Sequence, residues 1–344
     1  MSDRVLVAMS GGVDSSVAAA LLVGAGHEVV GATMKLWGGP SDSGCCSVAD
    51  VDDARSVARR LDIEHHVFNF GDDFDEHVVA PYVADHAAGH TPNPCIECNR
   101  HLKFDRLLRR ADALGFEWVA TGHHARIVEH ADGTHRVARG ADRAKDQSYV
   151  VHVLTRDVMR RVRFPVGHLT KDDVRAEAAR LGLTTATKPD SQDVCFITAT
   201  RGRAAFLGDR ITTRPGRVVD GTGATVGEVP AVELVTLGQR RGLGSPGGGH
   251  PWYVIDVDVT TATVTVGSAA DLRVGAALLD GLTWVGSPER GPLTAQVSAH
   301  GDPRPCHVEG ATVVFDEPSR RVAPGQSVVL YDGDLVVGGG TAAA

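Results

Sequence analysis

The chain has 344 residues, of which 42% are hydrophobic and 23% charged, and its formal net charge is −8. This composition is ordinary for a globular protein and leaves room for two or three domains. The first residues lack the layout of a signal peptide, and no apolar run approaches the roughly 20 residues that span a bilayer. We therefore expect a cytoplasmic protein without a membrane partner, whose six cysteines serve catalysis or metal binding rather than structural disulfides.

The first part of the chain alternates strand and helix patterns. Strands are expected at 5–9, 28–34, 64–70 and 116–124, and helices at 14–25, 50–61, 104–115 and 171–183. This alternation predicts an α/β fold with a mostly parallel sheet covered by helices on both faces.

After about residue 200 the pattern changes to short β-branched segments between Gly, Asp and Pro turns. They occur at 251–267, 293–300, 311–317 and 327–340. Such segments are typical of small barrels and sandwiches. We expect an α/β domain over 1–200, a small central domain over 201–272 and a C-terminal β-barrel over 273–344.

The charge is distributed unevenly along the chain. Residues 1–99 carry a net charge of −10, residues 100–217 carry +9 and residues 218–344 carry −7. A basic block inside an acidic protein is a candidate footprint for a polyanion, although a solvated basic face would give the same counts.

A glycine- and serine-rich stretch, Ser10-Gly11-Gly12-Val13-Asp14-Ser15-Ser16, lies between the first predicted strand and helix. Glycines let a backbone approach an anion closely, and a helix N-terminus offers unpaired N–H groups and a partial positive charge. No Lys follows the glycines, so the stretch is not the common phosphate loop, and it does not fit the dinucleotide fingerprint. It resembles the SGGxDSS pyrophosphate loop of ATP pyrophosphatases, which implies ATP with Mg²⁺ as the bound nucleotide.

Two other segments offer a nucleophile that could displace the oxygen that such an enzyme activates as a leaving group. "TPNPCIECNRHLKF" (91–104) contains Cys95 and Cys98, and "KPDSQDVCFI" (188–197) contains Cys195. A thiol near positive charge has a lowered pKa and is a better nucleophile. Cys98, which precedes several basic residues, suits that description.

The order of the motifs resembles that of the tRNA-specific 2-thiouridylases. The chain carries, in sequence, SGGVDSS, "NPCIECNRHLKF", "ATGHHAR" (120–126), "KDQSYV" (145–150), "FPVG" (164–167), "KPDSQDVCFI", "LGQRRGLG" and "PGQSVVLYDGDLVVGGG". The resemblance runs from about residue 4 to the C-terminus.

The resemblance implies that ATP adenylates the C2 oxygen of a wobble uridine in tRNA with release of pyrophosphate. Cys195 would carry a persulfide from an upstream sulfur donor, a cysteine desulfurase or a relay protein. Its outer sulfur, transferred directly or released first as hydrogen sulfide, would replace the oxygen as AMP leaves. Cys98 would resolve the persulfide through a transient disulfide with Cys195.

The resemblance also implies binding residues. The nucleotide would contact Ala8, Met9, Ser10, Gly11, Gly12, Val13, Asp14, Ser15, Met34 and Gly122. The tRNA would contact Asn93, Pro94, Cys95, His123, Lys145, Asp146, Gln147 and Gln326.

The sequence departs from the family pattern at three places. Cys95 stands where some relatives have Asp, and His124 stands where the family often has Tyr. The C-terminal Arg-Tyr pair of relatives is not evident in "VSAHGDPRPC" (297–306), where Arg304 is a candidate substitute for the arginine.

Several alternatives stay open. Cys95, Cys98 and Cys195 could ligate a [4Fe-4S] cluster whose fourth iron carries sulfide. A structural zinc site is disfavoured because it needs four ligands, and Cys45 and Cys46 have the wrong spacing. Another ATP-pyrophosphatase ligase, or a non-catalytic ATP sensor, would leave the cysteine motifs unexplained. The sequence does not settle which role Cys45 and Cys46 have.

Overall fold

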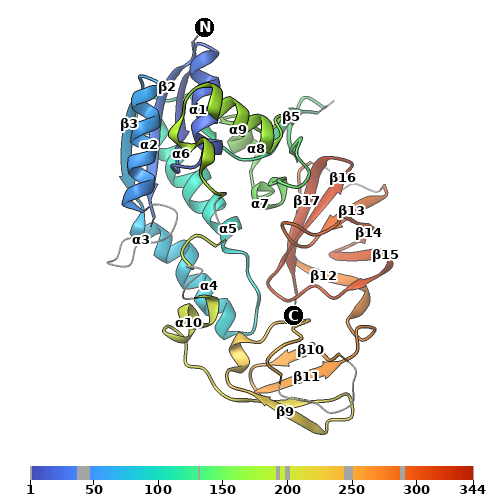
Figure 1. The fold of residues 1–344 in the computed structure, drawn as a ribbon. Helices are drawn as coiled ribbons and strands as arrows, with labels where there is room; N and C mark the ends of the chain where they lie inside the picture. Colours follow the sequence, from blue (N-terminus) through green and yellow to red (C-terminus); the bar gives the residue numbers. More distant parts are fainter. Residues whose placement is uncertain are drawn as a thin grey trace. The chain divides into compact units, whose positions relative to one another are not determined.

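The structure is a computed structural model that describes residues 2–36, 47–130, 132–190, 194–197, 202–243, 251–286 and 291–343. The chain folds into two compact units, shown in Figure 1. The first contains Met1–Val79, Pro94–Thr198 and Asp334–Val336, and the second contains Ala80–Asn93, Ala199–Gly333 and Val337–Ala344. Cys45 and Cys46 lie outside the described residues.

The first unit is built on a five-stranded sheet with the order β3-β2-β1-β4-β7, and every neighbouring pair is parallel. The strands are β1 (Arg4–Ala8), β2 (Glu28–Lys35), β3 (Glu64–Asn69), β4 (Trp118–Thr121) and β7 (Val162–Arg163). This confirms the predicted α/β fold with a parallel sheet. The strand order reverses direction at β1, because β2 and β3 extend to one side of it and β4 and β7 to the other.

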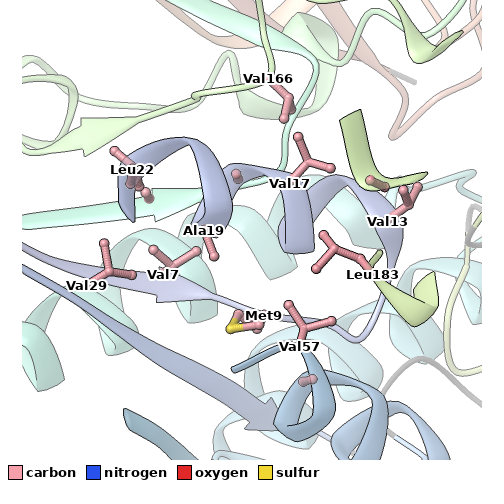
Figure 2. Packing of buried hydrophobic residues seen from close by; sticks show 14 of the residues in the cluster. Val7, Met9, Val13, Val17, Ala19, Leu22, Val29, Val57, Val166 and Leu183 are labelled. Atoms are coloured by element: carbon pink, nitrogen blue, oxygen red, sulfur yellow. The ribbon is translucent and has the colours of Figure 1, made fainter. Parts of the chain in front are cut away.

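The helices of the first unit are α1 (Val13–Gly24), α2 (Val48–Arg60), α3 (Gly71–Phe74), η1 (Asp75–Val79), α5 (Pro94–Glu97), η2 (Cys98–Arg106), α6 (Leu107–Ala113), α7 (Ser148–Val151), α8 (Arg156–Met159), α9 (Lys171–Arg180) and η3 (Thr184–Thr187). Among them, α1, α2, α6 and α8 contact strands of the sheet. The apolar faces of α1, α2 and α9 meet the sheet in one core, in which Val17, Val57 and Leu183 are buried (Figure 2). Right-handed crossovers place α6, which follows β3, on the opposite face.

A hairpin of β5 (Ala125–Glu129) and β6 (His135–Arg139) follows β4. The start of β17 (Leu335–Ala342) also folds with this unit, because Leu335 pairs with Ala138. Asp334 accepts ion pairs from Arg126 and Arg143. The sequence patterns had not indicated this hairpin.

The second unit contains the two β-rich segments that the sequence predicts. A four-stranded sheet has the order β10-β11-β8-β9, from β8 (Gly216–Val219), β9 (Thr225–Val229), β10 (Tyr253–Asp258) and β11 (Thr263–Gly267). The helices α4 (Ala80–Ala87), α10 (Gly202–Gly208) and η4 (Val232–Leu234) also belong to this unit.

The C-terminal strands close into a six-stranded barrel, as predicted. They are β12 (Arg273–Trp284), β13 (Leu293–Gln296), β14 (Arg304–Glu309), β15 (Thr312–Arg320), β16 (Ser327–Asp332) and β17, and the pairing of β12 with β17 closes the ring. Cys306 on β14 is buried in the barrel core, and burial together with Asp316 raises its thiol pKa to about 12. This thiol therefore serves packing and stays protonated at neutral pH.

No helix in the described ranges is both long and apolar enough to span a membrane.

Candidate active site

The point where the strand order reverses determines where the site lies. In open parallel sheets, ligands bind beyond the carboxyl ends of the strands at such a point, because neighbouring loops there diverge to opposite faces. β1 and β4 are direct neighbours, and Ala8 pairs in register with Thr121. The loop after β1 and the turn after β4, which begins at Gly122, therefore meet at this edge.

Two glycines in these loops are required by close packing. Gly11 has φ +71°, and a Cβ on it would lie 2.3 Å from the backbone oxygen of Asp50. A Cβ on Gly122 would lie 2.5 Å from the backbone nitrogen of Ser15. The loop is thus packed between the start of α2 and the turn after β4.

The loop leads into the start of α1, and no side chain caps that helix at Gly12. Instead the Ser15 hydroxyl accepts a hydrogen bond from the Ser10 N–H at 3.2 Å and donates to the Gly12 carbonyl at 3.1 Å. The Ser16 hydroxyl donates to the same carbonyl at 2.8 Å. These bonds fix a turn whose helix amides and positive dipole end suit an anion.

A lysine far along the chain supplies the positive charge that the loop motif lacks. Lys171, the first residue of α9, places its ammonium 2.8 and 2.7 Å from the two carboxylate oxygens of Asp14. His124 Nε2 also lies 3.0 Å from Asp14 Oδ1. Burial raises the pKa of Asp14, but the bonds to His124 and Lys171 outweigh it and hold that pKa below its ordinary value.

The same lysine connects the loop to a second carboxylate. Lys171 Nζ lies 2.9 Å from Asp190 Oδ1. Asp190 also forms ion pairs with Lys145 at 2.8 Å and with Arg175 at 2.7 Å. Burial raises the pKa of Asp190, but hydrogen bonds from Lys145 and Lys171 lower it well below its ordinary range. Asp190 is therefore ionised at neutral pH.

Sequence reasoning missed Lys171, Asp190 and the contact between His124 and Asp14. In the sequence, Lys171 is only the first residue of a predicted helix over 171–183, and Asp190 is one residue of the motif "KPDSQDVCFI". A sequence signal existed for Asp190 in the "KPDS" turn ahead of Cys195. For Lys171 there was none, because 157 positions separate it from Asp14.

The predicted catalytic cysteines lie on two different segments of the first unit. Cys98 is buried at the start of η2 within a helical run that extends from Pro94 to Ala113. Cys195 is half-buried, and its neighbour Phe196 packs edge-on against Phe74 with ring centroids 5.6 Å apart. Cys95, one turn before Cys98, is also half-buried.

Two of the predicted tRNA contacts are enclosed by protein. His123 is buried against the rings of Phe104 and Phe164, and its Nδ1 lies 2.6 Å from Thr121 Oγ1. Burial first, and then the charge of Lys103, keep the pKa of His123 well below its ordinary value, so the imidazole is neutral.

Asp146 is also buried, and its carboxylate accepts four hydrogen bonds. The donors are Arg139, the Gly140 N–H, and the N–H and hydroxyl of Ser148. Asp146 thereby shapes the loop that carries Lys145 and Gln147, both of which are exposed.

Gln147 also joins this loop to the turn after β4. Its side-chain oxygen accepts from the His124 N–H, and its own N–H donates to the His124 carbonyl, both at 2.9 Å. His124 therefore touches the pyrophosphate-type loop through its ring and the loop of residues 145–147 through its backbone.

In the second unit, the predicted contact Gln326 lies on a turn that meets the segment before Asn93. The Thr91 N–H donates to the Pro324 carbonyl at 2.8 Å. A Cβ on Gly325, which has φ +83°, would lie 2.9 Å from the Cβ of His90. The structure thus places Gln326 beside the chain that leads to Asn93, although 233 positions separate the two in the sequence.

A parallel sheet with this strand order and a glycine-serine loop at its reversal point defines an ATP-binding α/β protein of the pyrophosphate-loop class. The chain matches the family description tRNA methyl transferase HUP domain over residues 3–199. It also matches tRNA methyl transferase PRC-barrel domain over 204–268 and aminomethyltransferase beta-barrel domain over 276–342.

Full-length relatives specify the family. The chain is 45% identical to the tRNA-specific 2-thiouridylase MnmA of Thermobifida fusca (strain YX), over 100% of this chain and 96% of the relative. It is 48% identical to the protein of the same name from Rhodococcus jostii (strain RHA1), over 98% of this chain and 97% of the relative. The chain belongs to the family of tRNA-specific 2-thiouridylases.

The solved structures to which the chain is similar are more distant. One is a 4-thiouridine synthetase–RNA complex with bound ATP, at 18% identity and a TM-score of 0.38, covering 59% of this chain and 47% of that one. Another is the U34-tRNA thiolase NcsA from Methanococcus maripaludis with its [4Fe-4S] cluster, at 18% identity and a TM-score of 0.35, covering 55% of this chain and 60% of that one.

Proposed function

We propose that this protein catalyses the ATP-dependent 2-thiolation of the wobble uridine of tRNA. The observation that carries the proposal is the glycine-serine loop at the reversal point of the sheet, joined by Lys171 to the segment that leads to Cys195. Membership of the 2-thiouridylase family supports the substrate, since the full-length relatives are named for that activity.

ATP would bind across the carboxyl ends of β1, β2 and β4. The loop from Ala8 to Ser15 would hold the phosphates, and Met34 and Gly122 would lie beside the nucleotide. Lys171 would face the phosphates from α9, since its ammonium is already at the loop. Mg²⁺ typically binds one or two carboxylates together with substrate phosphates, and Asp14 is suitably placed to supply one.

The reaction has two chemical steps. The uridine O2 attacks the α-phosphorus of ATP, and pyrophosphate leaves. Sulfur then attacks C2, and AMP leaves with the former uridine oxygen. The adenylated oxygen leaves far more readily than a free carbonyl oxygen, which is why ATP is consumed before sulfur arrives. A positive charge such as that of Lys171 stabilises the leaving pyrophosphate.

In the proposed sulfur step, Cys195 carries the incoming sulfur as a persulfide. The Cys98 thiolate attacks Cys195 Sγ, the outer sulfur passes to C2, and a Cys98–Cys195 disulfide remains. Two external thiols then reduce that disulfide and are themselves oxidised to a disulfide. The sulfur would come from a cysteine desulfurase or a relay protein.

The alternative is a [4Fe-4S] cluster on Cys95, Cys98 and Cys195. In the described part of the chain, no three His, Cys, Asp or Glu side chains lie close enough together to hold a metal ion. We favour the persulfide route, which needs only Cys98 and Cys195.

The tRNA would contact the exposed Lys145 and Gln147 directly. Because His123 and Asp146 are buried, we propose that they act by shaping the nucleotide turn and the RNA loop. Asn93, Pro94 and Cys95 would meet the target base, which must leave its stack to react, and Gln326 would contact the RNA from the barrel. A cytoplasmic location stays a prediction from the sequence.

The test is a reconstitution with ATP, a sulfide or persulfide donor and a tRNA that has a wobble uridine, with and without oxygen. The tRNA is digested, its nucleosides are weighed by mass spectrometry, and AMP and ADP are quantified in parallel. We expect thiouridine at the wobble position, AMP as the product, and activity in both atmospheres. AMP without thiouridine would indicate another ligase of the ATP-pyrophosphatase class. Activity only without oxygen would favour the cluster.

A further inference from the structure

The first peptide group of the glycine-serine loop is hydrogen-bonded at both of its ends. This group joins Met9 to Ser10, directly after β1. The Met9 carbonyl accepts a buried hydrogen bond from the Thr33 hydroxyl on β2 at 2.7 Å. The Ser10 N–H donates to the Ser15 hydroxyl at 3.2 Å, and that hydroxyl donates in turn to the Gly12 carbonyl at 3.1 Å. The orientation of the peptide group is therefore fixed from β2 on one side and from α1 on the other.

His65 on β3 is the hydrogen-bond donor to the Thr33 hydroxyl. His65 Nε2 lies 2.9 Å from Thr33 Oγ1. The single hydrogen of this hydroxyl already bonds the Met9 carbonyl, and a carbonyl can only accept. The imidazole must therefore donate, so His65 Nε2 carries the hydrogen.

The ring of His65 is neutral at pH 7. Burial first, and then the charges of Arg55 and His66, lower its pKa below the ordinary value. His65 Nδ1 is buried and has no hydrogen-bond partner in the part of the chain that the structure describes. A hydrogen on Nδ1 would find no acceptor there, so the surroundings favour the neutral ring with its hydrogen on Nε2.

A glycine in β2 provides the space for this ring. Gly31 pairs in register with His65. A Cβ on Gly31 would lie 3.0 Å from His65 Cδ2 and 2.6 Å from Met9 Sδ. Because position 31 has no side chain, the His65 ring and the Met9 side chain can both pack against β2.

These contacts form one chain of hydrogen bonds in which every donor points in the same direction. The chain runs through His65 Nε2, Thr33 Oγ1, the Met9–Ser10 peptide group, Ser15 Oγ and the Gly12 carbonyl. Hydrogen bonds in such a chain polarise one another, so each is stronger than it would be alone. Loss of the first donor therefore weakens the later bonds, including those inside the loop.

We propose that His65 is a positioning residue for nucleotide binding, which as the first donor of this chain fixes the glycine-serine loop in its binding conformation before ATP arrives. This rests on the proposed function, because it assumes that the loop binds the phosphates of ATP. A loop that is already ordered loses less conformational entropy when it binds. His65 thereby raises the affinity for ATP through Thr33, and it leaves the chemical steps unchanged.

The experiment measures tRNA-dependent AMP formation by the full-length protein at varied ATP concentration. His65→Leu should raise the KM for ATP about fivefold, the factor that one hydrogen bond is worth, and change kcat by less than about twofold. His65→Gln should keep the wild-type KM, because its amide nitrogen is as many bonds from the backbone as Nε2 and also donates. A merely structural role of His65 would lower kcat through loss of folded protein and leave the KM unchanged.

His66→Leu is the matched control. His66 is the next residue on β3, its side chain is exposed, and its Nε2 lies 3.8 Å from Glu64 Oε2. This variant should keep the wild-type KM and kcat. A wild-type KM in His65→Leu, or a KM in His65→Gln as high as in His65→Leu, would overturn the proposal.

Thr33→Val interrupts the same chain one step later and covers the case in which His65→Leu fails to fold. It should raise the KM for ATP at least as much as His65→Leu does. Addition of His65→Leu to Thr33→Val should then change the KM by less than about twofold, because the chain is already broken. If the two effects multiply, the residues act separately and the chain has no role.

Hydrogen exchange without nucleotide separates the role of His65 from the proposed function. We expect amides of residues 9–16 to exchange about fivefold faster in His65→Leu and in Thr33→Val than in the wild type, and at the wild-type rate in His66→Leu. Exchange that is equal in all four proteins would refute the role of His65. A wild type that forms no tRNA-dependent AMP would refute the proposed function, whatever the exchange shows.

Discussion

The packing of Gly122 against the start of α1 predicts a large effect of one methyl group. In Gly122→Ala the new Cβ would lie 2.5 Å from the Ser15 nitrogen and 2.6 Å from the carbonyl carbon of Asp14. Both neighbours are backbone atoms at a helix start, so they cannot rotate away as a side chain would. The end of β4 or the start of α1 must therefore shift.

Such overpacking typically costs about 1–3 kcal/mol of unfolding free energy. At roughly 2–4 °C per kcal/mol for a domain of about 200 residues, the first unit should melt about 2–12 °C lower. The shift also displaces the turn that we propose holds the phosphates. We therefore expect the stabilisation by ATP to shrink as well.

The assay is thermal unfolding with and without ATP, on Gly122→Ala and on Gly24→Ala. Gly24 lies at the end of the same helix, and a Cβ there meets no atom within 4 Å. Alanine is favoured over glycine in helices by about 1 kcal/mol, so this control should melt at or above the wild-type temperature with an unchanged ATP shift. If Gly122→Ala matches the wild type in both melting temperature and ATP shift, our account of the turn is wrong.

Three further predictions concern single residues. Lys171→Met should lower tRNA-dependent AMP formation by about 10²–10³-fold. Arg180→Met, at the exposed end of the same helix, should leave the rate unchanged. If the two variants form AMP at the same rate, Lys171 does not act on the phosphates. Cys98→Ser should abolish thiouridine formation measured by mass spectrometry, and Cys306→Ala should keep it because Cys306 only packs in the barrel; thiolation by Cys98→Ser at the wild-type rate would exclude the relay. Burial lowers the pKa of His86 to about 4, with Arg203 adding to the effect. The unfolded chain therefore takes up a proton at His86 at a higher pH than the folded protein does. The contribution of the neutral, buried His86 to the free energy of unfolding is complete above pH 6.5, and up to about 3 kcal/mol of it is lost as the pH falls from 6.5 to 4. Urea unfolding at pH 7 and pH 4.5 should show a smaller loss for His86→Gln than for the wild type, and equal losses would contradict this.

Local patterns in the sequence determined the framework of the first unit. The predicted strand over 5–9 is β1, and the predicted helix over 14–25 is α1, each displaced by one residue. These elements carry strong signals because burial of a strand or of one helix face imposes a repeating apolar pattern on consecutive residues. The glycine loop between them could be predicted equally well, since its conformation depends on the glycines themselves.

Other elements depend on their neighbours and were missed. β12 runs over 12 residues, yet it alternates poorly because Gly275 and Gly281 interrupt it and much of it is exposed. It exists because β15 and β17 pair with it on both sides. A strand defined by its partners leaves little trace in its own sequence.

The sequence by itself also identified the glycine loop and the family motifs, because each of these is a short string of chemically distinctive residues. Only the tertiary structure decided which charges surround the loop. Lys171 reaches Asp14 across 157 positions because α9 packs against α1 in the same core, and the same ammonium joins Asp14 to Asp190. The structure also buried His123 and Asp146, which the motifs suggested as direct tRNA contacts. Burial and ion pairing depend on which segments the fold brings together, and no local window of sequence contains that information.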